Sequence, residues 1–171
     1  MSENYHIRLA KDYFVFSAAH FITFNGGICE RLHGHNYRVE AEIFGPLDEN
    51  QYVIDFIAAR DALHALCLEL DHHMLLPTGH PMIGVEVLHE GHEEGKEKEV
   101  EVTFEDRRWV FPREDCILLP VANTTTELLA RYLGLRLLEE LEQRTGQHPQ
   151  RIRLAVDENF GQWGVCDLEE E

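Results

Sequence analysis

Residues 29–45 have the sequence CERLHGHNYRVEAEIFG, and from Tyr37 onward apolar and charged side chains alternate strictly. Apolar side chains occupy every second position from Tyr37 to Ile43, with arginine or glutamate between them. A period of two is the spacing of a strand with one buried face. The pair Gly45-Pro46 is typical of a strand end. The stretch therefore predicts a half-buried strand over 36–45, which the fold must cover on one side.

The rest of the chain supplies further strands and two helices. Residues 13–20, YFVFSAAH, have the aromatic and apolar content of a strand, and residues 151–158, RIRLAVDE, alternate again. In 55–70 and 123–146 the apolar residues recur instead at steps of three and four, which is typical of amphipathic helices. This order of elements favours an α+β fold built on an antiparallel sheet.

Local signals predict where the two helices begin and end. Asp55 is a candidate N-cap for the first helix, which we expect to run into LDHHMLLP and to stop by Pro77. Thr124 and Glu127 have the spacing of a capping box at the start of the second helix. Gly146 is suited to end that helix.

Composition limits the classes of function. The chain has 171 residues and no linker, so we expect one domain over 1–171. A net charge of -17 repels phosphates and argues against nucleic-acid binding. No apolar run approaches the length of a membrane span, and the N-terminus lacks the features of a signal peptide. The four cysteines form no CxxC pair, and a cytoplasmic protein with free thiols is expected.

Residues 78–121 follow a looser and more acidic pattern. HEGHEEGKEKE, residues 89–99, is polar and punctuated by glycine, which predicts a solvated loop. Residues 99–104 and 107–112 alternate on either side of a turn near Asp106, and this predicts a hairpin.

Three histidines form a candidate metal site. His33 and His35 are two residues apart, so on an extended chain both side chains project from the same face. His20 ends the strand predicted before them, and an antiparallel neighbour would bring its ring close. Three imidazoles with an exchangeable fourth ligand are the usual set of a catalytic zinc. Cys29 is an alternative fourth ligand, which would close the site and make it structural.

Other polar residues allow two interpretations each. Asp71 can orient the imidazole of His72 for proton transfer, or the pair can simply mark the end of a helix. Glu158 follows an alternating strand, where it can anchor a polar ligand or lie in water. Cys29 and Glu30 are adjacent, and either side chain can act as a base.

The motifs taken together resemble a known family. FSAAH (16–20), CERLHGHNY (29–37), LDHH (70–73), NTTTE (123–127) and VDEN (156–159) occur in the order found in the 6-pyruvoyltetrahydropterin synthase / 6-carboxytetrahydropterin synthase family. The resemblance extends from about residue 12 to residue 160. It implies a tunnelling fold, in which a four-stranded antiparallel sheet carries two helices on one face. Residues 78–121 would be an acidic insertion, with a hairpin and a loop, that short family members lack.

The resemblance also assigns roles to single residues. It implies zinc bound by His20, His33 and His35, a catalytic thiol at Cys29, and a pair at Asp71 and His72 that works with the thiol. Glu158 would hold the pterin ring, and Thr125 and Thr126 would contact it. Family members assemble as a dimer of trimers, so a homo-oligomer is expected.

The implied substrate is 7,8-dihydroneopterin triphosphate, and three products are possible. Cys29 lies four residues before His33, a spacing that resembles the enzymes that make 6-carboxy-5,6,7,8-tetrahydropterin, a precursor of 7-deazaguanine nucleosides such as queuosine. Related enzymes stop at 6-pyruvoyltetrahydropterin. A third branch carries a glutamate three residues before the first histidine, as Glu30 is here, and releases 6-hydroxymethyl-7,8-dihydropterin for folate synthesis. The combined motif CExxHGH implies either activity or both. A zinc- or pterin-binding protein without turnover is the alternative outside the enzymes.

Overall fold

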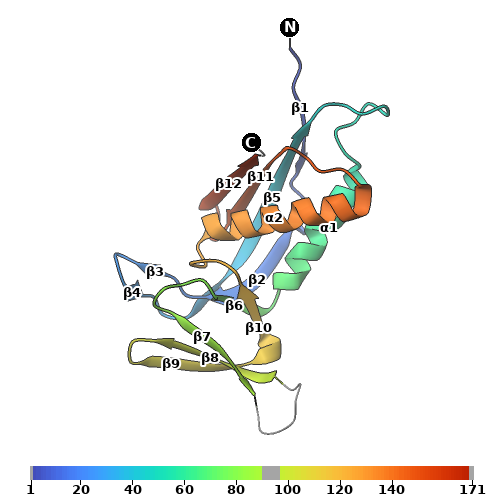
Figure 1. Ribbon diagram of the computed structural model, residues 1–171. Coiled ribbons are helices and arrows are strands. Elements are labelled where there is room, and N and C mark those ends of the chain that lie inside the picture. Colours follow the sequence, from blue (N-terminus) through green and yellow to red (C-terminus); the bar gives the residue numbers. More distant parts are fainter. Residues whose placement is uncertain (1, 90–96, 170–171) are drawn as a thin grey trace.

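The computed structural model describes residues 2–89 and 97–169, and over these ranges the chain forms a large mixed sheet, two helices and a smaller second sheet (Figure 1). The large sheet consists of β1 (Tyr5–Leu9), β2 (Val15–His20), β5 (His33–Gly45), β6 (His73–Pro77), β10 (Cys116–Leu119), β11 (Arg151–Asp157) and β12 (Trp163–Glu169). The helices are α1 (Phe56–Leu70) and α2 (Thr126–Thr145). The remaining elements are β3 (Thr23–Phe24), β4 (Ile28–Cys29), β7 (Gly84–His89), β8 (Glu97–Phe104), β9 (Arg107–Pro112) and the short 3-10 helix η1 (Arg113–Asp115).

The large sheet is built around the strand that the opening alternation predicts. Its order is β10-β6-β2-β5-β11-β12, and β1 pairs with the far half of β5. Strands β1, β2 and β11 each form an antiparallel pair with β5, and β12 forms an antiparallel pair with β11. The four-stranded antiparallel core expected for the tunnelling fold is therefore present. β6 and β10 extend it with parallel pairs that the sequence patterns did not predict.

Both helices cover one face of this sheet, and the α+β class is confirmed (Figure 1). The main core fills the space between them, and Tyr37, Val39, Ala41 and Ile43 of β5 all point into it. The opposite face is polar, with ion pairs such as Arg8–Glu40 and Arg153–Asp167. No helix in the described part of the chain is long and apolar enough to span a membrane.

The first helix lies in the range 55–70 that the sequence predicts. α1 begins at its predicted N-cap, where Asp55 accepts from the backbone N–H groups of Ile57 and Ala58. It ends at Leu70, and the residues from His73 to Pro77 form β6, a strand that the sequence patterns did not predict. A central strand buried on both faces has no alternation, so its pattern resembles a continued helix.

α2 ends as predicted at Gly146, which adopts the left-handed conformation with a φ of 71°. The predicted capping box does not form. Thr125 is the N-cap without a side-chain hydrogen bond, and the Thr124 hydroxyl instead donates to the carbonyl of Phe21.

The insertion supplies all three strands of the second sheet. The hairpin expected near Asp106 is confirmed as β8 and β9, and β7 pairs with β8 as an unpredicted third strand. The loop predicted over 89–99 falls mainly on residues 90–96, which lie outside the described residues. A second hydrophobic cluster joins this sheet to the large one through residues such as Phe21, Met74, Val102 and Phe104.

Candidate metal centre and active site

The strand register brings the three candidate metal ligands together. His20, the last residue of β2, lies directly opposite His33, the first residue of β5. His35 projects from the same face as His33, and the three rings lie 4.7–5.3 Å apart between centroids. Their ligand atoms all lie within 4.8 Å of one another. The chain therefore forms a cluster of three imidazoles at one end of the sheet.

Backbone carbonyls orient two of the rings. His20 Nδ1 lies 3.0 Å from the carbonyl oxygen of Thr124, and His33 Nδ1 lies 2.8 Å from that of Arg31. A carbonyl only accepts hydrogen bonds, so each Nδ1 carries the proton and each Nε2 is left with a lone pair. Histidines that bind a metal through one ring nitrogen usually donate a hydrogen bond from the other nitrogen in this way.

The cluster fits a transition-metal ion. His20 is buried, and its Nε2 atom has no hydrogen-bond partner. Burial, with a smaller effect from His33 and His35, lowers the pKa of His20 to about 4. The ring is thus neutral at pH 7, as a ligand must be. Three clustered imidazoles, one with an unpartnered buried nitrogen, suit zinc or a similar ion.

Cys29 and Glu30 lie beside this cluster but take different positions. The Glu30 Oε2 atom is 4.0 Å from His33 Nε2. The Cys29 thiol packs against the second hydrophobic cluster and lies 3.5 Å from the Glu30 carbonyl oxygen. Within the described residues the group able to hold a metal contains only the three histidines. This arrangement does not support the alternative in which Cys29 closes the site as a fourth ligand.

The environment of the Cys29 thiol has opposing effects on its pKa. Partial burial raises the pKa, the nearby Arg107 guanidinium lowers it, and the charge of Glu30 raises it again. The net effect is a raised pKa, so the thiol is protonated at neutral pH in this single chain.

Asp71 and His72 form the expected pair. His72 Nδ1 lies 2.7 Å from Asp71 Oδ2, and Asp71 Oδ1 accepts from the backbone N–H of Ser17 at 2.7 Å. These bonds, the Ser17 bond first, lower the pKa of Asp71. His72 is largely exposed and has a φ of 60°. Across the described part of this chain, neither residue has a hydrogen bond or ion pair with Cys29 or the histidine cluster.

Glu158 follows β11 and is half-buried. Its position is linked to the cluster through Tyr37, whose ring packs edge-on against His20 and His35 at 5.8 and 5.5 Å. Burial raises the pKa of Tyr37, and the charges of Glu158 and Glu30 add to the effect. The two glutamates thus act on the same buried hydroxyl, which has no hydrogen-bond partner.

The candidate pterin contacts on α2 differ in exposure. Thr125 is half-buried, whereas Thr126 is buried against Gly164 of β12. The roles of these threonines, like those of the other candidate site residues, stay predictions.

Sequence reasoning missed three residues at this site. Tyr37 was assigned only to the buried face of its strand. Thr124 supplies the carbonyl that orients His20, and Arg107 contacts the backbone of Cys29 and Glu30. No local pattern marks these contacts, because each joins segments far apart in the chain.

Comparisons with known proteins all point to one family of enzymes, the tetrahydropterin synthases. The sequence model described as 6-pyruvoyl tetrahydropterin synthase matches residues 9–169. A Methanocaldococcus jannaschii protein named as a 6-carboxy-5,6,7,8-tetrahydropterin synthase is 31% identical over 152 residues, covering 88% of this chain and 87% of that protein.

Solved structures agree. The Plasmodium falciparum 6-pyruvoyl tetrahydropterin synthase has a TM-score of 0.85 and 29% identity, covering 99% of this chain and 100% of that one. The Plasmodium vivax enzyme, solved with a catalytic glutamate replaced by alanine, has a TM-score of 0.85, 26% identity and the same coverage. This chain is therefore a lyase of the 6-pyruvoyl tetrahydropterin synthase family.

Proposed function

We propose that this protein is a zinc-dependent lyase that converts 7,8-dihydroneopterin triphosphate to 6-carboxy-5,6,7,8-tetrahydropterin. The observation that carries the proposal is the cluster of His20, His33 and His35, with the Glu30 carboxylate beside it and Cys29 next to Glu30 in the chain. Relatives named as 6-carboxy-5,6,7,8-tetrahydropterin synthases support this choice of product.

The chain offers a group for each task in this reaction. A zinc ion held by the three histidines would polarise the oxygens of the substrate side chain and acidify the neighbouring C–H groups. Cys29 would take up a proton once its thiol is ionised, for which the Arg107 cation is favourable. Asp71 holds the His72 ring in one orientation, so His72 can pass a proton. Glu158 would hold the pterin ring through its carboxylate.

A second reaction is supported by the position of Glu30. Its carboxylate lies 4.0 Å from a candidate zinc ligand, which supports a role as a second base beside a metal bound there. The related Plasmodium vivax enzyme was solved with a catalytic glutamate replaced, once by alanine and once by cysteine. Glu30 would support side-chain cleavage to 6-hydroxymethyl-7,8-dihydropterin. A product that stops at 6-pyruvoyltetrahydropterin is the remaining alternative.

We also infer a homo-oligomer, expected to be a dimer of trimers. In the described part of the chain the large sheet ends on the free edges of β10 and β12, which can pair with other copies. Among the described residues, the Asp71–His72 pair has no hydrogen bond or ion pair with Cys29, which supports a site completed by a second subunit. Free thiols on all four cysteines suit a reducing, cytoplasmic location.

The test is a product analysis with 7,8-dihydroneopterin triphosphate. Wild type, Cys29→Ala and Glu30→Ala are incubated with the substrate, and the three candidate pterins are separated by chromatography. The proposal expects 6-carboxy-5,6,7,8-tetrahydropterin from wild type and its loss in Cys29→Ala. Undiminished output of that pterin by Cys29→Ala would refute the role of the thiol. A hydroxymethyl product that survives Cys29→Ala but is lost in Glu30→Ala would establish the second reaction.

A further inference from the structure

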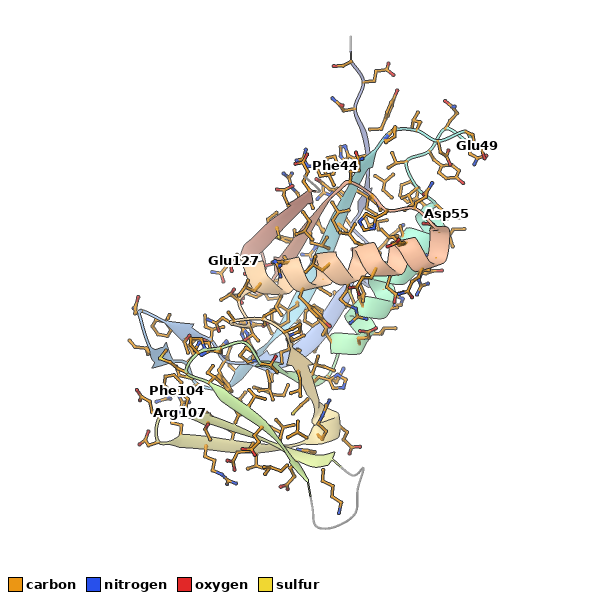
Figure 2. The ribbon with its side chains drawn as sticks, viewed as in Figure 1. Phe44, Glu49, Asp55, Phe104, Arg107 and Glu127 are labelled. Carbon is orange, nitrogen blue, oxygen red and sulfur yellow. The ribbon has the colours of Figure 1, made fainter. Side chains whose placement is uncertain are left out.

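Arg107, from the inserted sheet, reaches the backbone of both candidate bases. Its Nη1 donates to the carbonyl oxygen of Cys29 at 2.9 Å, and its Nη2 donates to that of Glu30 at 3.0 Å. The two nitrogens of one rigid fork therefore fix two successive peptide groups. Figure 2 shows Arg107 near Phe104 in the second sheet. A flexible lysine side chain has no such planar fork.

Aromatic side chains hold the Arg107 side chain in place. Its guanidinium lies over the Trp109 ring, 4.6 Å from the centroid. Trp109 stacks in turn on Phe21, with centroids 4.8 Å apart and an angle of 19° between the rings. Phe21 is buried and directly follows the candidate zinc ligand His20. These contacts fix the guanidinium relative to the histidine cluster, independently of its hydrogen bonds to Cys29 and Glu30.

A second residue of the insertion holds the opposite strand. Thr23 of β3 lies directly opposite Cys29 of β4. His80 Nδ1 accepts from the backbone N–H groups of Met82 and Ile83, so its proton is on Nε2, which donates to the Thr23 hydroxyl at 2.7 Å. The small hairpin that carries the bases is thus attached to the insertion on both of its strands.

We propose that Arg107 is a positioning residue for Cys29 and Glu30, and that the insertion over 78–121 serves to hold this catalytic segment against the metal site, with His80 as its second attachment. The role of the two bases rests on the proposed function. The other restraints lie mainly on the first strand, where Asn123 bonds to the backbone of Thr23. On the strand of the bases, Glu30 N–H donates to the Ile22 carbonyl, and the tip of the hairpin, residues 24–26, is exposed. Displacement of a catalytic group by about 1 Å can reduce a rate by about 100-fold.

The first test measures the backbone directly. Hydrogen exchange of the peptide covering residues 28–32 is compared in wild type, Arg107→Ala and Arg107→Lys. The control is Arg108→Ala, which removes the same charge from the next position, where the side chain is 61% exposed and pairs with Glu101. Loss of two charge-assisted hydrogen bonds is expected to speed exchange at least about tenfold in Arg107→Ala. Arg107→Lys should recover only part of the protection, and Arg108→Ala should match wild type.

The second test uses the same variants in steady-state kinetics, with zinc content measured on each sample. We expect kcat to fall about 100-fold in Arg107→Ala while KM and zinc content stay close to wild type. A purely structural role would instead lower zinc content and stability together with activity. His80→Ala is expected to speed exchange at Thr23 and to lower kcat by a smaller factor.

The outcomes separate the two proposals. Exchange in Arg107→Ala equal to that in Arg108→Ala, or full recovery in Arg107→Lys, would overturn the positioning role whatever the activity. If Arg107→Ala fails to fold, Arg107→Lys decides the matter, since it keeps the charge and loses the fork. If exchange is faster in Arg107→Ala but the wild-type protein makes no pterin product, the positioning role stands and the proposed function is refuted.

Discussion

Replacement of Asp157 by alanine is expected to destabilise the protein and to weaken substrate binding. Asp157 ends β11, and its side chain is 1% exposed. Its Oδ1 atom accepts from the backbone N–H groups of Asn159 at 3.2 Å, Gly161 at 2.9 Å and Gln162 at 2.9 Å. One buried carboxylate thus folds the loop that presents Glu158, the residue predicted to hold the pterin.

The size of the effect follows from the number and the setting of these bonds. A hydrogen bond from a backbone N–H to a charged group contributes about 1.5–3 kcal/mol. Residues 159–162 are exposed, so water can reach the freed N–H groups and the lower value applies. Three bonds then correspond to about 4.5 kcal/mol, or a decrease in Tm of about 10–15 °C for a chain of this size. Asp157→Asn keeps an acceptor oxygen, and about half of the loss is expected.

Urea denaturation and substrate titration provide the assay. Asp167→Ala is the matched control, because its carboxylate on β12 is 44% exposed and its pair with Arg153 is expected to contribute about 0–1 kcal/mol. Asp157→Ala should also raise KM, since Glu158 loses its fixed position. A loss of stability no larger than that of Asp167→Ala would refute the reasoning, and so would an unchanged KM in a clearly destabilised variant.

Three further predictions concern the helix start, pH and assembly. A Cβ at Gly164 would come within 2.5 Å of Thr126 Oγ1 and of the backbone of α2, so Gly164→Ala should cost about 3 kcal/mol in thermal unfolding; an unchanged Tm would contradict this. Burial lowers the pKa of His20 from 6.5 to about 4, so the unfolded chain takes up more protons as pH falls below 6.5. The metal-free protein should therefore lose about 3 kcal/mol between pH 6.5 and pH 4 in urea denaturation, and a His20→Gln variant should not show this loss. Cys29→Ala and Asp71→Ala should each be inactive alone but recover activity when co-assembled; no recovery would argue against a site shared between subunits.

The parts of the fold that sequence could predict are those in which one face is buried. The strand over 36–45 and both helices have a single apolar face, and Asp55 and Gly146 mark helix ends through interactions within a few residues. β6 was not predicted because Met74, Leu75 and Leu76 are buried in succession. A parallel strand covered on both sides carries no period that a single sequence can reveal.

The candidate site divides in the same way. His33 and His35 share a face by local geometry, and the register that joins β2 to β5 places His20 opposite them. The capping box failed because Thr124 is buried, and there its hydroxyl bonds to Phe21 rather than to its own helix. The role of Arg107 could not be predicted for a related reason. It lies 78 and 77 residues along the chain from Cys29 and Glu30, whose carbonyls it contacts.

The geometry of Cys29 and Glu30 bears on why this chain carries two bases. Neighbouring side chains on an extended segment point to opposite sides, and these two do so. Glu30 lies beside His33, whereas the Cys29 thiol faces the hydrophobic cluster between the two sheets. Neither group can therefore reach the position of the other without a change in the backbone, which Arg107 holds at both carbonyls. It follows that Cys29 should not rescue Glu30→Gln, nor Glu30 rescue Cys29→Ala, and that each substitution should remove a different proton transfer.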